Sequence, residues 1–415
     1  MAVKDWITDY KLNISDSLFS VQIFLVAFGA LITVPILTGL DPAVALFTAG
    51  AATLIFHGLT KRLIPVFLAS SYTYTAPILA ATETWGLPAA LGGLVVAGLV
   101  YTGIGGIIYW KGRNIIASLF PPIVVGPIMM VIGLMLSPVA VSMALGKSNP
   151  AHLIPDKIGL LIAVITLAVT IIIFLLARGI LKLLPILGGL IAGYLVAIPF
   201  GIVDFSIVAS APWFAVPRFV LPQFNVSAVV FLIPAVVAPV IAHFGDILTI
   251  GEVTEKDYLR EPGIHRTLLA NGAANTIASF VGGPPVRIYP EITGALTVFK
   301  KGRPAIMIWA AVLAMILAFL GKISAIIQTI PDPVNGGMLI LFFGALVVAG
   351  IHCLLKEPAP LLDFRNILIV VLILVSGIGG IIFSAGAFSL KGAALATLIG
   401  VILNRILPHK KADDS

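Results

Sequence analysis

Long uncharged apolar stretches recur along the whole chain, and they restrict its possible folds more than any other feature. Ile158–Ala177 and Ile367–Phe383 are two of them, each long enough to cross the roughly 30 Å hydrocarbon core of a bilayer as a helix. Of the 415 residues, 60% are apolar and only 10% are charged, whereas a soluble domain needs about a quarter of its residues charged. The sequence therefore predicts an all-α integral membrane protein embedded in the lipid bilayer.

The apolar runs and their breaks divide the chain into about fourteen membrane segments. Lysine and arginine test this count, because cytoplasmic loops hold most of the cations. With the N-terminus inside, nineteen of the 25 Lys and Arg residues fall on the cytoplasmic side, five fall outside and Arg287 lies within the membrane. We therefore expect a multi-pass protein of the cell (inner) membrane with both termini cytoplasmic. The net charge of +7 follows from this bias and does not indicate a nucleic-acid partner.

Two of the segments make poor membrane helices. They are Ala69–Pro77 and Gly282–Glu291, which are short and polar, and each has a proline leading into an apolar run. Proline is well placed in the first turn of a helix, so we expect a short extended strand feeding a half-helix in each case. Non-helical backbone survives at membrane depth only where protein buries it or where it lines a cavity.

The interrupted segments lie in corresponding places of two halves. Pro77 and Pro290 are separated by nearly the same number of residues as the first spans of the two halves, so we expect a repeat. Seven spans per half is an odd number, so the second half must be inverted. Paired interrupted helices of this kind mark a transporter's binding site. The expected divisions are a cytoplasmic segment 1–18, a first repeat 19–205, an extracellular or periplasmic connector 206–227, a second repeat 228–407 and a cytoplasmic tail 408–415.

Few ionisable residues fall inside the predicted membrane segments. Asp246 lies in the eighth segment and Glu291 at the start of the tenth, four residues after Arg287. Ionisable groups at this depth cost free energy and usually face a cavity or a partner. Glu291 and Asp246 are candidates for substrate binding or proton transfer, or they are structural acceptors that tie the segments together. Arg287 either contacts an anionic substrate or pairs with one of these acids. His243 is a candidate proton carrier or a packed residue.

The half-helices predict a binding site for a polar or anionic group. Their N-termini offer free backbone N–H groups and the positive ends of helix dipoles, which suit a carboxylate, an oxyanion or a polarised carbonyl. Tyr72, Thr73, Tyr74 and Tyr289 lie in the interrupted segments. The tyrosines supply flat faces and hydroxyls suited to a planar heterocycle, or they serve in ordinary packing.

Motifs along most of the chain, from about residue 19 to 407, resemble the nucleobase–ascorbate transporter family, which includes uracil:proton symporters and xanthine permeases. The resemblance implies seven plus seven inverted spans, core and gate domains, a frequent dimer and elevator-like motion of the core. The motifs that carry it are Phe28-Gly-Ala, Phe120-Pro-Pro, His243-Phe-Gly-Asp246, Glu261-Pro-Gly-Ile-His-Arg266, Asn271-Gly, Gly282-Gly-Pro-Pro285, Ile330-Pro-Asp-Pro-Val-Asn-Gly-Gly337 and Leu390-Lys-Gly.

The same resemblance implies roles for particular residues. Glu291 matches the family's nucleobase-binding glutamate, in a site between the third and tenth segments and the eighth helix. Asp246 matches a position that holds histidine or aspartate in relatives. Two departures stand out, since Ala242 replaces the usual substrate-binding glutamate and Arg287 adds a positive charge.

Two transport functions lead at this stage, and a channel-like conductance on the same fold is a third alternative. The first is proton-coupled uptake of a uracil- or xanthine-like compound, with Glu291 binding it and Asp246, Glu291 or His243 carrying the proton. The second is transport of a small carboxylate, sulfonate or bicarbonate-like anion through Arg287 and the half-helix N-termini. The sequence contains no evident cluster of metal ligands, no phosphate-binding loop and no nucleophile–base pair. We therefore expect no cofactor, no metal and no enzymatic activity.

Overall fold

A computed structural model describes residues 14–111, 121–147, 154–179, 181–299, 302–355, 363–385 and 388–407. Most of the predicted tails at 1–18 and 408–415, and Phe120 of one motif, lie outside these ranges. In the first half the main helices are α1 (Ile14–Thr38), α2 (Pro42–Leu59), α3 (Thr75–Trp85), α4 (Leu87–Lys111), α6 (Pro122–Ala144), α7 (Asp156–Leu176) and α8 (Pro185–Ala197).

The second half repeats this series of helices. Its eighth segment is a helix interrupted at Pro234, where a short 3-10 turn joins two α-helical parts. The elements are α10 (Val226–Leu232), η5 (Ile233–Val236), α11 (Val237–Thr254), α12 (Ile264–Phe280), α13 (Pro290–Phe299), α14 (Pro304–Ala318), α16 (Asp332–Leu354), α17 (Phe364–Ile378) and α18 (Gly392–Ile406). This series agrees with the predicted membrane protein of two sets of seven segments.

Besides the two predicted strands of the interrupted segments, the structure contains short elements that the apolar pattern does not indicate. Among them, α9 packs against α15, and β3 pairs with β4 in an antiparallel hairpin before α18. These elements are too short or too polar to stand out as membrane segments. The short elements are β1 (Leu68–Ser70), η2 (Tyr72–Tyr74), η3 (Leu181–Leu183), η4 (Ile198–Phe200), α9 (Phe205–Ser210), η6 (Leu259–Gly263), β2 (Val286–Ile288), α15 (Gly321–Gln328), β3 (Ile382–Ala385) and β4 (Phe388–Lys391).

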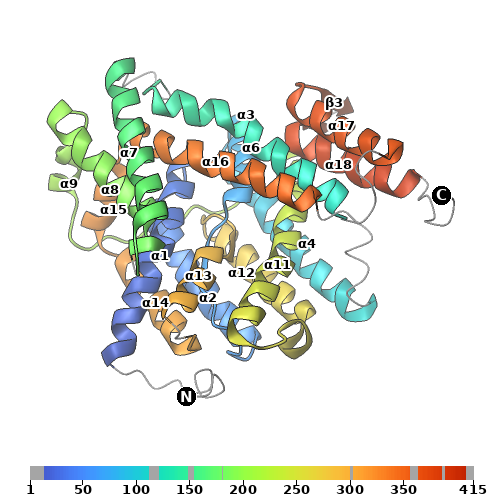
Figure 1. Ribbon diagram of the computed structural model, residues 1–415, viewed down its shortest axis with the longest axis horizontal. Coiled ribbons are helices and arrows are strands. Elements are labelled where there is room, and N and C mark those ends of the chain that lie inside the picture. The colour runs from blue at the N-terminus through green and yellow to red at the C-terminus, as the bar shows by residue number, and fades with distance from the viewer. Residues whose placement is uncertain are drawn as a thin grey trace.

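The helices separate into a core and a gate. In the core, α1, α2, α4 and α11 to α14 surround β1 and β2 and share one cluster of buried apolar side chains. In the gate, α6, α16, α17 and α18 share a second cluster, and α7 and α8 pack beside α16. Figure 1 shows the gate helices α6, α7 and α16 to α18 above the core helices α2, α12 and α13.

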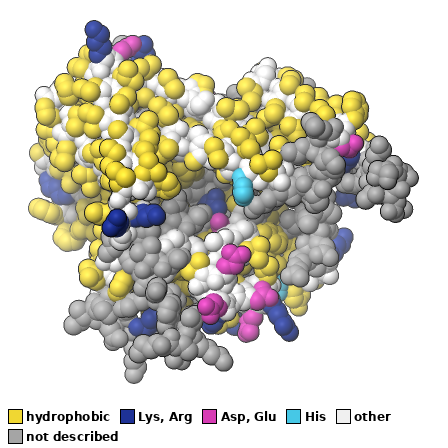
Figure 2. All heavy atoms as spheres, in the orientation of Figure 1, with side chains coloured by type: hydrophobic (Ala, Val, Ile, Leu, Met, Phe, Trp, Pro, Cys, Tyr) yellow, Lys and Arg dark blue, Asp and Glu magenta, His cyan; other side chains and the backbone are white. Residues whose placement is uncertain are grey.

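The surface is that of a membrane protein. Six described helices are long and apolar enough to span a bilayer, and α7 is only 28% buried over its most apolar window. Large apolar side chains such as Leu175 and Leu176 are exposed along it. Figure 2 shows hydrophobic side chains covering the upper part of the molecule, while most acidic side chains gather in the lower part. The chain is therefore a multi-pass membrane protein.

Glycines allow the paired helices to approach closely. On α4, a Cβ added to Gly98 would lie 2.6 Å from the backbone nitrogen of Thr276 on α12. On α6, a Cβ at Gly126 would lie 2.7 Å from the carbonyl oxygen of Gly350 on α16. Small residues at such seams are how membrane helices pack without a hydrophobic driving force between them.

We expect Gly98→Ala to lower the unfolding free energy by about 1–3 kcal/mol, because the new methyl group forces α4 away from α12. Gly103→Ala on the same helix is the matched control, since nothing lies within 4 Å of the added Cβ and alanine is the better helix former. Intrinsic-fluorescence melting of the purified proteins measures both changes. Equal melting temperatures for the two variants would contradict this account of the seam.

Candidate substrate site

The two interrupted segments cross as a pair of antiparallel strands inside the core. Leu68 of β1 lies opposite Ile288 of β2, and Ala69 lies opposite Arg287. The amide of Ser71 extends the pairing by donating to the carbonyl oxygen of Pro285 at 2.8 Å. Each strand leads into a half-helix: β1 continues through η2 into α3, and β2 continues into α13, which begins at Pro290. This is the predicted arrangement of short extended strands and half-helices.

Helix α2 holds the first strand with two side chains. The Thr53 hydroxyl accepts a hydrogen bond from the amide of Leu68 at 2.9 Å. One turn further on, Nε2 of His57 lies 2.8 Å from the carbonyl oxygen of Val66. Since a carbonyl only accepts, this histidine nitrogen donates. Both side chains are buried, so they satisfy backbone groups that no solvent can reach.

Helix α12 holds the second strand in the same way. The amide of Val286 donates to Oδ1 of Asn275 at 2.6 Å, and Nδ2 of Asn271 donates to the carbonyl oxygen of Val286 at 3.3 Å. Thr53 and Asn271 are 218 positions apart, and so are His57 and Asn275. The two halves of the chain therefore place a four-residue-spaced pair at matching positions. We call these four side chains the strand clamp.

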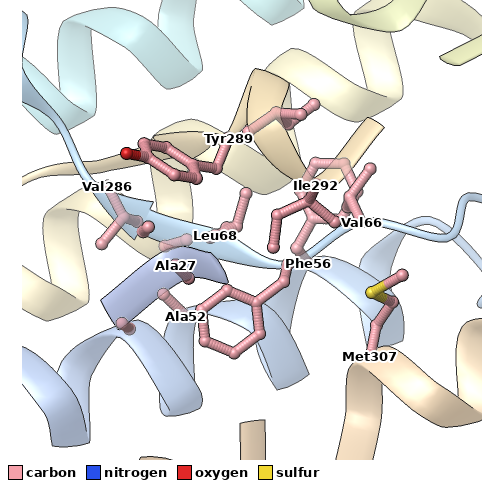
Figure 3. Packing of buried hydrophobic residues seen from close by; sticks show 14 of the residues in the cluster. Ala27, Ala52, Phe56, Val66, Leu68, Val286, Tyr289, Ile292 and Met307 are labelled. Carbon is pink, nitrogen blue, oxygen red and sulfur yellow. The ribbon is translucent and has the colours of Figure 1, made fainter. Parts of the chain in front are cut away.

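Apolar packing completes the surroundings of the strands. Figure 3 shows Ala27, Ala52 and Phe56 beneath the strand that carries Leu68, with Val286 beside it. Because the strands are antiparallel and each leads into a helix, α3 and α13 extend away from the crossing with their N-termini at it. The two half-helices therefore begin beyond opposite ends of the three-residue ladder, and the start of a helix is where backbone N–H groups lack intrahelical partners.

Asp246 and Arg287 form an ion pair between α11 and β2. The guanidinium Nη2 of Arg287 lies 2.7 Å from Oδ2 and 3.1 Å from Oδ1 of Asp246. Nε of Arg287 donates to the carbonyl oxygen of Ile288 at 3.2 Å. The Arg287 side chain is 20% exposed and the Asp246 side chain is 10% exposed. Of the two pairings expected for this arginine, the described contacts include the one with Asp246.

His243 and Ala242 precede this aspartate on α11. His243 is buried, and its Nε2 lies 2.8 Å from the hydroxyl of Thr267 on α12. Its ring also packs edge-on against Tyr101 of α4, with ring centroids 6.1 Å apart. The described contacts of His243 thus resemble those of a packed, hydrogen-bonded residue. Ala242 brings no polar group to the helix.

The residues predicted around the first interrupted segment have separate surroundings. Tyr72 stacks on Phe342 of the gate helix α16, with ring centroids 3.8 Å apart, and so joins the core to the gate. Thr73 hydrogen-bonds Ser71 through their hydroxyl oxygens, 2.8 Å apart. It also lines a cavity of about 500 Å³ between α3, α6, α10 and α17. Tyr74 is buried in an apolar cluster with Ile78.

The second interrupted segment supplies the remaining predicted residues. Tyr289 is buried in the apolar core cluster. Glu291 follows Pro290 as the second residue of α13, so its backbone lies at the N-terminus of that half-helix. The side chain of Glu291 lies outside the described part of the structure. Among the described residues, no group of three His, Cys, Asp or Glu side chains could hold a metal ion.

The strand clamp and Phe342 are functional candidates that the sequence analysis did not single out. Asn271 appeared only as part of a family motif. The available signal was a pair of polar residues four positions apart, repeated at the same spacing before each interrupted segment. Phe342 gave no signal, because an aromatic residue in an apolar helix is ordinary.

Asn275→Leu removes the acceptor for the Val286 amide, so we expect it to lower the unfolding free energy by about 1–3 kcal/mol. Thr276→Val on the same helix is the control, because among the described residues the Thr276 hydroxyl donates to the carbonyl oxygen of Gly272 within α12 and does not reach β2. Thermal melting in detergent compares the two variants. If the melting temperature of Asn275→Leu equals that of the wild type, the strand clamp does not stabilise the strand.

Two interrupted helices that cross inside an inverted repeat of membrane helices define a secondary active transporter. The xanthine/uracil permease model, described as "Permease family", matches residues 15–385, and the chain belongs to this family. It is a transporter of the uracil permease family and not an enzyme.

Sequence relatives match along nearly the whole chain. A "Probable uracil permease" of Haemophilus influenzae is 41% identical over 399 residues, covering 96% of each chain. The "Uracil permease" of Bacillus subtilis is 40% identical over 406 residues, covering 96% of this chain and 93% of that one.

Solved structures of other transporters share the fold. The transmembrane domain of the cyanobacterial bicarbonate transporter BicA matches with a TM-score of 0.63 at 17% identity, covering 95% of this chain and 98% of that one. SLC26A9 matches with a TM-score of 0.71 at 14% identity, covering 98% of this chain and 66% of that longer one. At these identities the likeness concerns the fold alone.

Proposed function

We propose that this protein takes up a neutral nucleobase of the uracil or xanthine type together with protons. The observation that carries the proposal is the Asp246–Arg287 ion pair. The arginine was the main reason to consider an anionic substrate. With its guanidinium 2.7 Å from a carboxylate oxygen, the pair is neutral as a whole and offers no net attraction to a second anion.

Glu291 and the half-helix N-termini are the proposed ligand-binding groups. A lactam such as uracil has N–H donors that need an acceptor and carbonyl oxygens that need a donor. The Glu291 carboxylate would accept from the ring N–H. The free backbone N–H groups at the starts of α3 and α13 would donate to the ring carbonyls. Tyr72, Thr73, Tyr74, Tyr289 and Ala242 stay predicted ligand contacts, although Tyr72 stacks on Phe342, Thr73 lines a different cavity and Tyr74 is buried in an apolar cluster.

Proton coupling is assigned to Glu291 or Asp246. A carboxylate that alternates between a charged and a neutral form can couple proton entry to ligand binding. His243 is the weaker candidate, since it already hydrogen-bonds Thr267. The names of the relatives, which include uracil permeases at 41% and 40% identity, support uracil as the first compound to test.

Transport would proceed by movement of the core against the gate. The Tyr72–Phe342 stack is one contact that this movement must change. A homodimer formed through the gate, with both termini cytoplasmic, suits this mechanism because the gate then stays fixed while each core moves.

Proteoliposomes with an inward proton gradient test the transport reaction. Radiolabelled uracil should accumulate, a protonophore should abolish the accumulation, and unlabelled sulfate or bicarbonate should not compete. Glu291→Gln should reduce uptake to that of protein-free vesicles, because the ring N–H loses its charged acceptor. Glu83→Gln, an exposed acid on the other half-helix, should retain uptake. Competition by the anions with no uptake of uracil or xanthine would refute the nucleobase assignment.

Binding experiments separate the two substrate classes at Arg287. In the double variant Asp246→Asn/Arg287→Gln neither charge is left unpaired, so uracil should still stabilise the protein. At about a hundred times its Kd a ligand adds roughly 2.7 kcal/mol to the unfolding free energy. A bound anion would lose most of its affinity in the same variant. Thermal shifts of the double variant with uracil and with sulfate measure the binding of each ligand. Loss of the uracil shift alone would show that the ion pair contacts the nucleobase.

A further inference from the structure

A second cavity lies at the boundary between the core and the gate, on the side where α7 and α16 face the membrane. It has a volume of about 320 Å³ and is lined by residues of α1, η2, α7, α8 and α16. Apart from two threonines and the stacked Tyr72, its described lining is made of apolar side chains, including Phe174, Ile186, Met338 and Phe342. The volume is within the usual range for a small-molecule or lipid-chain pocket.

The cavity borders the membrane-facing surface. Phe174 on α7 is 59% exposed and Leu341 on α16 is 37% exposed, and both line it. In a membrane protein such exposed apolar side chains meet lipid chains. Helices α7 and α16 pack against each other, and α8 packs against α7 and α1. Because Phe174 and Leu341 belong to both the lining and the membrane-facing surface, a hydrocarbon chain could reach the cavity from the bilayer without crossing water.

Basic residues follow directly at the end of the cavity that is predicted to be cytoplasmic. Arg178 follows the end of α7 four residues after Phe174, and Lys182 lies three residues before Pro185, which also lines the cavity. Both side chains are exposed, and neither has an ion pair within the described part of the chain. Residues 157–203 contain no aspartate or glutamate that could neutralise them. Basic side chains at this depth attract anionic lipid headgroups.

We propose that this cavity binds an acyl chain of an anionic phospholipid whose headgroup is held by Arg178 and Lys182. The chain would lie against the Tyr72–Phe342 stack, which connects the core to the gate. The bound lipid would therefore act at the contact that must change when the core moves. The proposal concerns lipid binding alone and does not depend on the transported substrate.

Native mass spectrometry of the purified full-length protein tests the headgroup contact. Phosphatidylglycerol should bind more tightly than phosphatidylcholine with the same acyl chains. Arg178→Gln/Lys182→Gln should weaken phosphatidylglycerol binding by roughly tenfold to thirtyfold, since each cation near the surface contributes about one kcal/mol. Lys256→Gln/Arg260→Gln, which removes two cations predicted to be on the same membrane side but away from the cavity, should leave it unchanged. Equal binding of both lipids, or equal loss in the two variants, would overturn the proposal.

A photoreactive phosphatidylglycerol with a diazirine on its acyl chain locates the site. Labelled peptides should include residues 170–176 and 338–345. Ala345→Phe, which adds volume at the cavity lining, should reduce labelling of both peptides, and Leu341→Trp provides a second variant if the first does not purify as a monodisperse protein. Labelling confined to other helices, or labelling unchanged by both variants, would show that the chain does not occupy this cavity.

Discussion

Two pieces of extended backbone deep inside a membrane protein must have every hydrogen-bonding group satisfied from within, and the rest of this structure depends on that constraint. Water is absent at this depth, and each unpaired N–H or C=O group costs several kcal/mol. The strands β1 and β2 meet part of the requirement by pairing with each other. The strand clamp meets another part, through one donor and one acceptor from α2 and the same from α12.

The position of the candidate site follows from this crossing. β1 leads through η2 into α3 and β2 leads directly into α13, so both half-helices, with the backbone of Glu291 at the start of α13, begin close to the crossing in sequence. Close helix packing also supports the crossing. α4 approaches α12 through Gly98, and α12 carries Asn271 and Asn275 of the strand clamp. The ion pair between Asp246 and Arg287 then connects α11 to β2. Packing, hydrogen bonding and charge therefore all fix the geometry of the same two strands.

The sequence predicted the membrane fold and the interrupted segments, because hydrophobic length and proline position report directly on the bilayer. The sequence alone could not identify a partner for Arg287, since Asp246 and Glu291 were equally available. The choice depends on how β2 is placed against α11 in the folded chain. Nor could it indicate the Tyr72–Phe342 stack, whose members are about 270 positions apart and meet only in the folded chain. The clamp was visible as a spacing, but its purpose depends on knowing where the strands cross. The hairpin of β3 and β4 was missed because Ile382 and Phe383 continue the apolar run predicted as one helix, whereas α17 ends at Ile378 before Gly379 and Gly380.

The strand clamp also shows which property the two halves of this repeated membrane protein share. At matching positions one half uses a hydroxyl and an imidazole, and the other uses two amides. In α2 the first of the two residues accepts and the second donates, whereas in α12 the first donates and the second accepts. Residue identity and even the order of the roles have thus diverged between the halves, while the count of one donor and one acceptor per helix has not. What the two halves of this repeat have in common at these positions is one hydrogen-bond donor and one acceptor facing the strand. Different amino acids supply them in each half.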